Sequence, residues 1–181
     1  FLFVFSGVHA QFNDFRPHQL ETSTEGLRIK LLLEASTDLI TTDPSTSLEY
    51  ASLAQNLAES TTSDSVEAWI YMEVGEIYYS LRALEEAEQA YLEANQYYLK
   101  VPEMDPQAAK AYYEMGRLYK LMGRYGDALI SFENCFSLAE ELEDIWLQAN
   151  LMRRTANISK HMGELENALE FARSSIELSS R

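Results

Sequence analysis

The chain has few of the residues that interrupt regular structure, with seven glycines and four prolines in 181 positions. Glycine and proline build turns and end helices and strands. Their scarcity excludes a fold of many short strands joined by tight turns, and it favours long helices. Hydrophobic residues make up 46% of the chain and charged residues 24%, which is typical of a folded domain and not of a disordered segment.

Cysteine and histidine are also scarce, with one cysteine, Cys135, and three histidines at positions 9, 18 and 161. A single cysteine excludes an intrachain disulfide, and the scattered histidines argue against a metal cluster. The sequence has no phosphate-binding glycine loop, no GxSxG and no HExxH. We therefore expect no catalytic residues, no metal and no cofactor, and we predict that the chain is not an enzyme.

Basic residues are outnumbered two to one, with 14 lysines and arginines against 29 aspartates and glutamates and a formal net charge of -15. A surface this acidic repels phosphate backbones and anionic lipids. Nucleic acid is therefore excluded as an expected partner, and so is direct binding of this segment to a membrane.

The clearest positive feature is an internal repeat. The segment YMEVGEIY at Tyr71–Tyr78 aligns with YYEMGRLY at Tyr112–Tyr119, and their glycines lie 41 residues apart. Twelve residues after each glycine comes an alanine, and an aromatic residue follows four later. A small residue in one helix lets a second helix approach closely, so each copy predicts a helical hairpin. Weaker copies precede and follow these two.

This pattern resembles the tetratricopeptide-repeat family from about residue 26 to the end. The resemblance implies an all-α fold, an α-solenoid of about four antiparallel helical hairpins in a right-handed superhelix. Its repeats would cover 26–62, 63–103, 104–143 and 144–181, with helices at 25–41, 44–60, 65–81, 83–99, 106–122, 124–141, 144–161 and 164–179. The step near 40 exceeds the usual 34 and is similar to extracytoplasmic parts of bacterial signalling proteins.

The resemblance also implies a non-catalytic interaction scaffold, with a peptide-binding groove lined by the first helix of each hairpin at i, i+3, i+7 and i+10. The residues at these positions in the last three repeats are Trp69, Met72, Glu76 and Tyr79; Lys110, Tyr113, Arg117 and Lys120; and Asn150, Arg153, Asn157 and Lys160. They include five of the 14 basic residues. This groove predicts an acidic linear peptide or a peptide C-terminal carboxylate as partner, whereas the plainer alternative is a helix face that collects long polar side chains.

The lysine–asparagine carboxylate clamp of chaperone-binding members is not reproduced, because Met72 and Glu76 stand where lysine and asparagine are wanted. A chaperone-tail receptor is therefore not expected.

Both ends of the repeat array raise separate expectations. In the first repeat the groove positions would be Ile29, Leu32, Ser36 and Leu39. Such an apolar patch needs a cover, which would be the segment 11–25 or a partner protein. At the far end Leu169, Ile176 and Leu178 lack a polar capping helix, so either the chain continues or the C-terminal repeat forms a homodimer.

The first ten residues, FLFVFSGVHA, resemble the end of a secretory signal peptide. The alternative for 1–10 is an apolar segment docked on the fold. With the repeats, this start favours an extracytoplasmic (periplasmic) sensor or oligomerisation part of a larger bacterial signalling protein, anchored through sequence after Arg181. The alternative is a stand-alone adaptor or peptide receptor, periplasmic or cytoplasmic, that binds acidic linear peptides.

Overall fold

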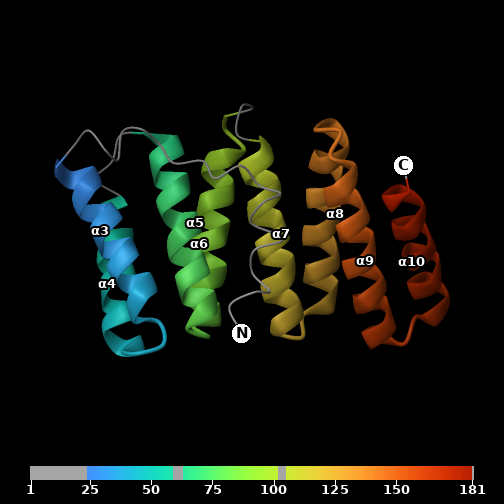
Figure 1. Cartoon of the computed structure of the whole chain (residues 1–181), viewed down its shortest axis with the longest axis horizontal. Helices are drawn as coiled ribbons and strands as arrows, with labels where there is room; N and C mark the ends of the chain where they lie inside the picture. The colour runs from blue at the N-terminus through green and yellow to red at the C-terminus, as the bar shows by residue number, and fades with distance from the viewer. Residues whose placement is uncertain (1–23, 59–62, 102–104, 181) are drawn as a thin grey trace. The chain divides into compact units, whose positions relative to one another are not determined.

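The computed structural model describes residues 24–58, 63–101 and 105–180, which form eight α-helices and no strand (Figure 1). The helices are α3 (Thr24–Leu39), α4 (Pro44–Ala58), α5 (Asp64–Ser80), α6 (Leu84–Tyr98), α7 (Asp105–Leu121), α8 (Tyr125–Glu141), α9 (Ile145–Met162) and α10 (Leu165–Ser179). Each predicted helix is present, with bounds within two residues of those expected. The prediction of an all-α fold is confirmed.

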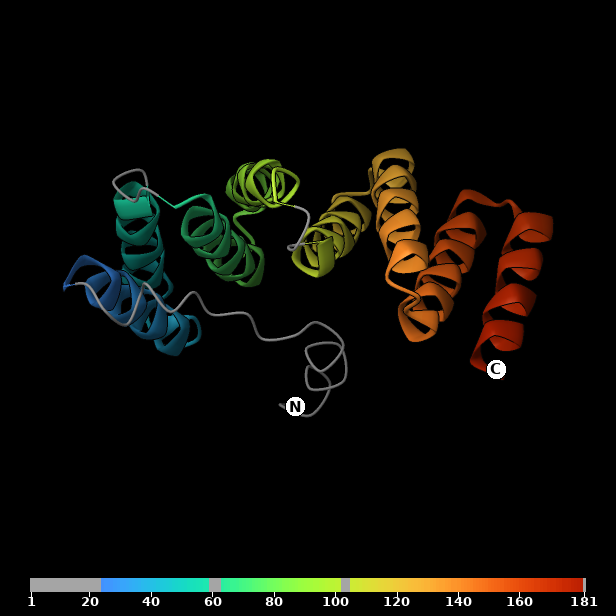
Figure 2. The ribbon, with the colours of Figure 1, turned by 90° about the horizontal axis from the view of Figure 1, so that it is seen from above.

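The helices pair as four hairpins, and the hairpins group into two compact units (Figure 2). The N-terminal unit contains α3 to α6 and the C-terminal unit contains α7 to α10. The first helices of the hairpins begin at Thr24, Asp64, Asp105 and Ile145. None of the described helices combines the length and the apolar character that crossing a bilayer requires.

Close approach within two hairpins depends on glycine. A Cβ added at Gly75 would lie 2.6 Å from the ring of Tyr91, and one added at Gly116 would lie 2.4 Å from the ring of Phe132. Both rings are buried between the helices. The predicted role of these small residues, to let the second helix pack directly on the first, is therefore confirmed.

Left-handed glycines follow the first helices of two hairpins. Gly123 after α7 and Gly163 after α9 have φ values of 75° and 83°, a backbone region that glycine adopts without strain at the ends of helices. Arg82 and Glu143 adopt the same region in two other turns. No glycine stands at those positions, so their conformation could not be predicted from the residue type.

In the first hairpin, the structure corrects the predicted groove. Ile29 and Ser36 are buried, and Ser36 Oγ donates to Ser47 O at 2.7 Å while Ser47 Oγ donates to Ser36 O at 2.7 Å. This face of α3 is the contact with α4, so the expected exposed apolar patch is wrong. Residues 11–23 of the expected cover 11–25 lie outside the described residues, as does the segment 1–10, and residues 24–25 begin α3.

The last helix has an open apolar face. Leu169 and Ile176 of α10 are 60% and 71% exposed, because no further helix of the described chain packs on them. This confirms that the hairpin presents apolar side chains there, and the homodimer stays a prediction.

Cys135 occupies the small-residue position of α8 and is buried. Its Sγ donates to the carbonyl oxygen of Ala109 at 3.1 Å, and burial raises the pKa of the thiol far above its ordinary value. Because only the thiolate reacts with alkylating reagents, native protein at pH 8 should resist iodoacetamide. Mass spectrometry should show modification after unfolding in denaturant. Rapid alkylation of the native protein would contradict this placement.

Candidate functional site

Charge is divided between the helices of the C-terminal unit. The first helices of its hairpins, α7 and α9, carry six cations and two acids. The second helices, α8 and α10, carry seven acids and one cation, Arg173. In a chain with a net charge of -15, α7 and α9 are the exception. The N-terminal unit differs, since its first helices α3 and α5 carry seven acids and two cations.

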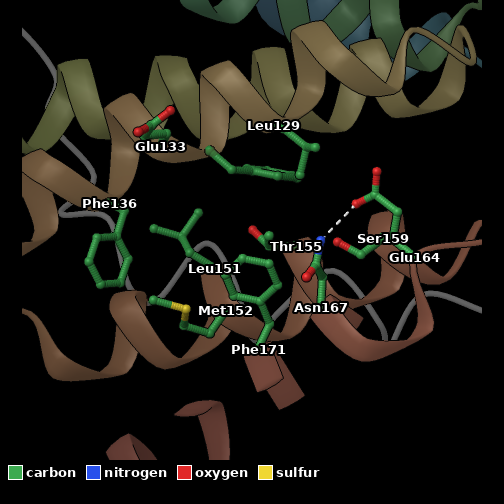
Figure 3. A pocket seen from close by; sticks show the side chains of 11 residues that line it. Leu129, Glu133, Phe136, Leu151, Met152, Thr155, Ser159, Glu164, Asn167 and Phe171 are labelled. Carbon is green, nitrogen blue, oxygen red and sulfur yellow. Dashed lines mark hydrogen bonds between the residues drawn. The ribbon is translucent and has the colours of Figure 1, made fainter. Parts of the chain in front are cut away.

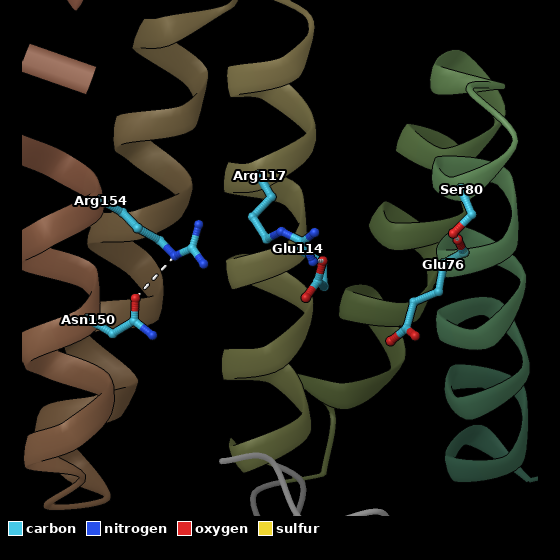
Figure 4. Close-up of polar contacts among 6 residues, drawn as sticks. All are labelled: Glu76, Ser80, Glu114, Arg117, Asn150 and Arg154. Atoms are coloured by element: carbon cyan, nitrogen blue, oxygen red, sulfur yellow. Dashed lines mark hydrogen bonds and ion pairs between the residues drawn. The ribbon is translucent and has the colours of Figure 1, made fainter. Parts of the chain in front are cut away.

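Side chains of α7 and α9 meet in a polar group that we call the α7–α9 cluster. Its members are Glu114, Arg117 and Lys120 on α7 and Asn150, Arg153, Arg154 and Asn157 on α9. On α7, Arg117 Nη1 donates to Glu114 Oε2 at 2.5 Å, one helical turn away (Figure 4). The Glu114 side chain is 6% exposed and that of Arg117 is 22% exposed. This carboxylate is thus held under a guanidinium group.

On α9 one amide positions two arginines. Asn150 Oδ1 accepts from Arg153 Nη2 at 3.0 Å and from Arg154 Nε at 3.2 Å. Both residues follow Asn150 by one turn, so the helix itself presents them to the same oxygen. Figure 4 shows the Arg154 side chain extending from α9 toward α7.

Two contacts join the helices. Lys120 Nζ donates to Asn157 Oδ1 at 2.8 Å, and the Arg154 guanidinium lies 4.6 Å from the centre of the Tyr113 ring. The second contact is a cation–π interaction, which is stronger where water is excluded. Together they fix the spacing of the cations on the two helices.

The cluster holds four cations and one carboxylate. Burial, and the neighbouring guanidinium groups of Arg154 and Arg153, lower the pKa of Lys120. The pKa of Arg154 is also lowered, chiefly by burial and further by Arg117 and Arg153. Burial is the chief cause of both shifts, and repulsion from the neighbouring guanidinium groups adds to it. An anion at this surface would relieve the repulsion.

The structure separates the predicted groove residues into two groups. Those from the third and fourth repeats lie on α7 and α9, where Arg117, Lys120, Arg153, Asn150 and Asn157 join the cluster. Lys110 lies two turns before Arg117, and Lys160 is exposed on the last turn of α9. Tyr113 is buried beneath Arg154, so it supports a cation and is not itself at the surface.

The other predicted residues lie on α5. Trp69 is 8% exposed, Met72 is 2% exposed and Tyr79 is half-buried. Trp69 borders a depression of about 420 Å³ that three acids line, Glu34, Asp38 and Glu73, with one cation, Lys30. The groove predicted for the second repeat is therefore flanked by carboxylates, and whether its residues contact a peptide stays a prediction.

Sequence reasoning missed Arg154. The i, i+3, i+7, i+10 pattern selects Arg153 and passes over its neighbour, which lies one turn from Asn150 and reaches Tyr113. Two adjacent arginines in an acidic chain were the available signal. No set of three or more histidine, cysteine, aspartate or glutamate side chains is arranged to hold a metal ion among the residues described.

The single buried carboxylate of the cluster gives a stability test. Replacing Glu114 by glutamine should lower the free energy of unfolding by about 1–2 kcal/mol, because the ion pair with the partly buried Arg117 is lost among neighbouring cations. Urea denaturation measures this change. The control is Asp127→Asn, which disrupts the exposed Arg124–Asp127 ion pair and should cost no more than about 0.5 kcal/mol. Equal effects of the two substitutions would contradict the assigned role.

Comparison with known proteins agrees with this architecture. Residues 109–142 match the family model of the tetratricopeptide repeat. Among solved structures, BtubC from P. vanneervenii aligns with a TM-score of 0.73 and 16% identity over 93% of this chain and 68% of its own. A putative kinesin light chain from P. anserina with nearly identical tetratricopeptide-like repeats has a TM-score of 0.70 and 13% identity over 84% and 75%.

A third structure is the Rap conjugation gene regulator of plasmid pLS20 in complex with the Phr* peptide, with a TM-score of 0.66 and 15% identity. It covers 91% of this chain, which spans 46% of the regulator. A search of curated protein sequences gave no match. At these identities the solved structures establish the fold.

Proposed function

We propose that this chain, a tetratricopeptide-repeat protein, acts as an interaction scaffold that binds an acidic linear segment of a partner at the α7–α9 cluster. The observation that carries the proposal is the concentration of four cations around one carboxylate in a chain with a net charge of -15. The scaffold role rests on the fold, and the acidic ligand rests on the cluster.

The geometry of the cluster suits carboxylates. Arginine presents a planar fork of donors that pairs with a carboxylate through two parallel hydrogen bonds. Each hydrogen bond to a charged group is worth about 1.5–3 kcal/mol. Asn150 and Tyr113 hold the two α9 arginines before any ligand arrives, so less side-chain entropy is lost on binding.

A related fold lends support to a peptide as ligand. The Rap regulator, similar in structure, is solved in complex with the Phr* peptide. An extended segment also fits a surface formed by two neighbouring helices better than a compact domain does.

The direct test compares two fluorescent ten-residue peptides, one rich in aspartate and glutamate and the other carrying the corresponding amides. Fluorescence anisotropy should show at least tenfold tighter binding of the acidic peptide, with affinity that falls as salt increases because the cluster and ligand are screened. Equal binding of the two peptides, or no binding of either, would refute the proposal.

The apolar start FLFVFSGVHA favours a second proposal, namely that the scaffold works outside the cytoplasm as the sensor or oligomerisation part of a bacterial signalling protein. Export can be tested by fusing residues 1–181 to a reporter enzyme that is active only in the periplasm. Activity that disappears when residues 1–10 are deleted would support export. Equal activity with and without those residues would argue for the alternative, a stand-alone adaptor.

A further inference from the structure

A cavity in the C-terminal unit, lined by other residues than those of the α7–α9 cluster, is the strongest candidate for a second site. It lies between α8, α9 and α10 and has a volume of about 390 Å³ (Figure 3). We propose that this α8–α10 cavity binds a bulky apolar side chain carried on a basic segment of a partner protein. The site is separate from the α7–α9 cluster and does not depend on the function proposed for it.

The walls of the cavity are apolar and fixed. Phe132 and Leu151 are buried and form part of the packed hairpin interior. Phe136, Met152 and Phe171 also line the cavity but are only half-buried. Figure 3 shows these side chains, which come from α8, α9 and α10, gathered around the same space. An incoming apolar group would cover carbon surface that is still in contact with water, which is favourable because apolar surface is removed from water.

One end of the cavity is polar and acidic. Thr155, Ser159, Glu164 and Asn167 line this end, and Asn167 Nδ2 donates to Glu164 Oε2 at 3.2 Å (Figure 3). Glu133 of α8 is the other charged residue in the lining, and the lining contains no cation. The site therefore combines an apolar interior with two carboxylates at its rim.

The negative charge of the surrounding helices favours a basic partner. Helices α8 and α10 carry seven acids and one cation, so an acidic peptide or an anionic amphiphile would be repelled. Lysine or arginine beside an apolar anchor would be attracted to Glu133 and Glu164. The volume lies near the lower end of the range for ligand pockets, about 300–1,000 Å³, which suits one or two side chains of a linear segment.

The test uses two twelve-residue peptides rich in lysine and arginine, one with a central phenylalanine and the other with serine at that position. At 150 mM salt, anisotropy should show that the phenylalanine peptide binds at least tenfold more tightly. Thr155→Phe, which places an aromatic ring inside the cavity, should weaken its binding at least tenfold. Glu133→Lys should weaken it several-fold without disturbing the core, which keeps the test decisive if Thr155→Phe unfolds.

Two controls separate this site from general attraction. Glu177→Lys makes the same charge change as Glu133→Lys but on α10 and outside the cavity lining. It should leave the dissociation constant of the phenylalanine peptide within about twofold. Lys120→Ala in the α7–α9 cluster should not change the affinity for the phenylalanine peptide. Failure of the cavity proposal is therefore distinct from failure of the acidic-peptide proposal. Equal binding of the two peptides, or equal loss in Glu177→Lys and Glu133→Lys, would overturn the inference. The inference would also be overturned if the phenylalanine peptide bound only to self-associated chains, so that binding depended on the protein concentration.

Discussion

Replacing Gly116 by alanine should lower the free energy of unfolding by about 2 kcal/mol, within the range for overpacked cores. The new methyl group would lie 2.4 Å from the Phe132 ring, which is buried between the helices and would have to shift to admit it. Either the ring leaves its position or α7 and α8 separate. Alanine is otherwise the better helix former by about 1 kcal/mol, so a loss of stability isolates the packing cost. Chemical denaturation followed by circular dichroism measures it.

Gly126 provides the matched control. It lies in α8, and a Cβ added there would meet nothing within 4 Å. Gly126→Ala should therefore leave stability unchanged or raise it by as much as about 1 kcal/mol. If both substitutions stabilise the protein, the close approach of α7 and α8 at Gly116 is not as described.

The second large effect concerns ligand binding. Changing Lys120 and Arg153 together to alanine should weaken binding of the acidic peptide at least tenfold, which corresponds to 1.4 kcal/mol. Both side chains reach solvent on the cluster, and their removal leaves the Glu114–Arg117 ion pair and the contact of Arg154 with Tyr113 intact. The folded structure should therefore persist, which a thermal unfolding curve verifies.

A control pair removes the same amount of charge elsewhere. Arg28 on α3 and Arg173 on α10 are exposed and lie outside the cluster. Their replacement by alanine changes the net charge equally and should alter the affinity by less than about twofold, since exposed charges at a distance are screened. If both pairs of substitutions weaken binding equally, the ligand responds to overall charge and not to the cluster.

The helices could be predicted from the sequence because their signals are local. Gly116, together with Ala128 and Phe132, indicates that two helices pack closely as a hairpin. Gly163 indicates the end of α9, where the backbone is left-handed. The first repeat lacks a matching glycine, and Ser36 and Ser47 bond to each other between α3 and α4. Two of the groove residues expected there, Ile29 and Ser36, are buried, so a buried face was taken for an exposed one.

The candidate sites were harder to predict from the sequence than the helices were. Periodicity identified most cations of the cluster, but it could not show that Arg154 rests on Tyr113 or that Glu114 is buried beside Arg117, because these depend on rotamers. The α8–α10 cavity was not predicted at all. Its lining comes from three helices, and side chains such as Phe136 and Phe171 look like ordinary core residues until their packing is known.

The most direct test of the central claim is to map the acidic peptide on the protein by amide chemical shifts in NMR spectra. The largest shifts on titration should fall on α7 around 113–120 and on α9 around 150–157, and they should saturate with the affinity measured by anisotropy. Shifts confined to α3 and α5, or spread evenly over the chain, would contradict a binding site at the α7–α9 cluster.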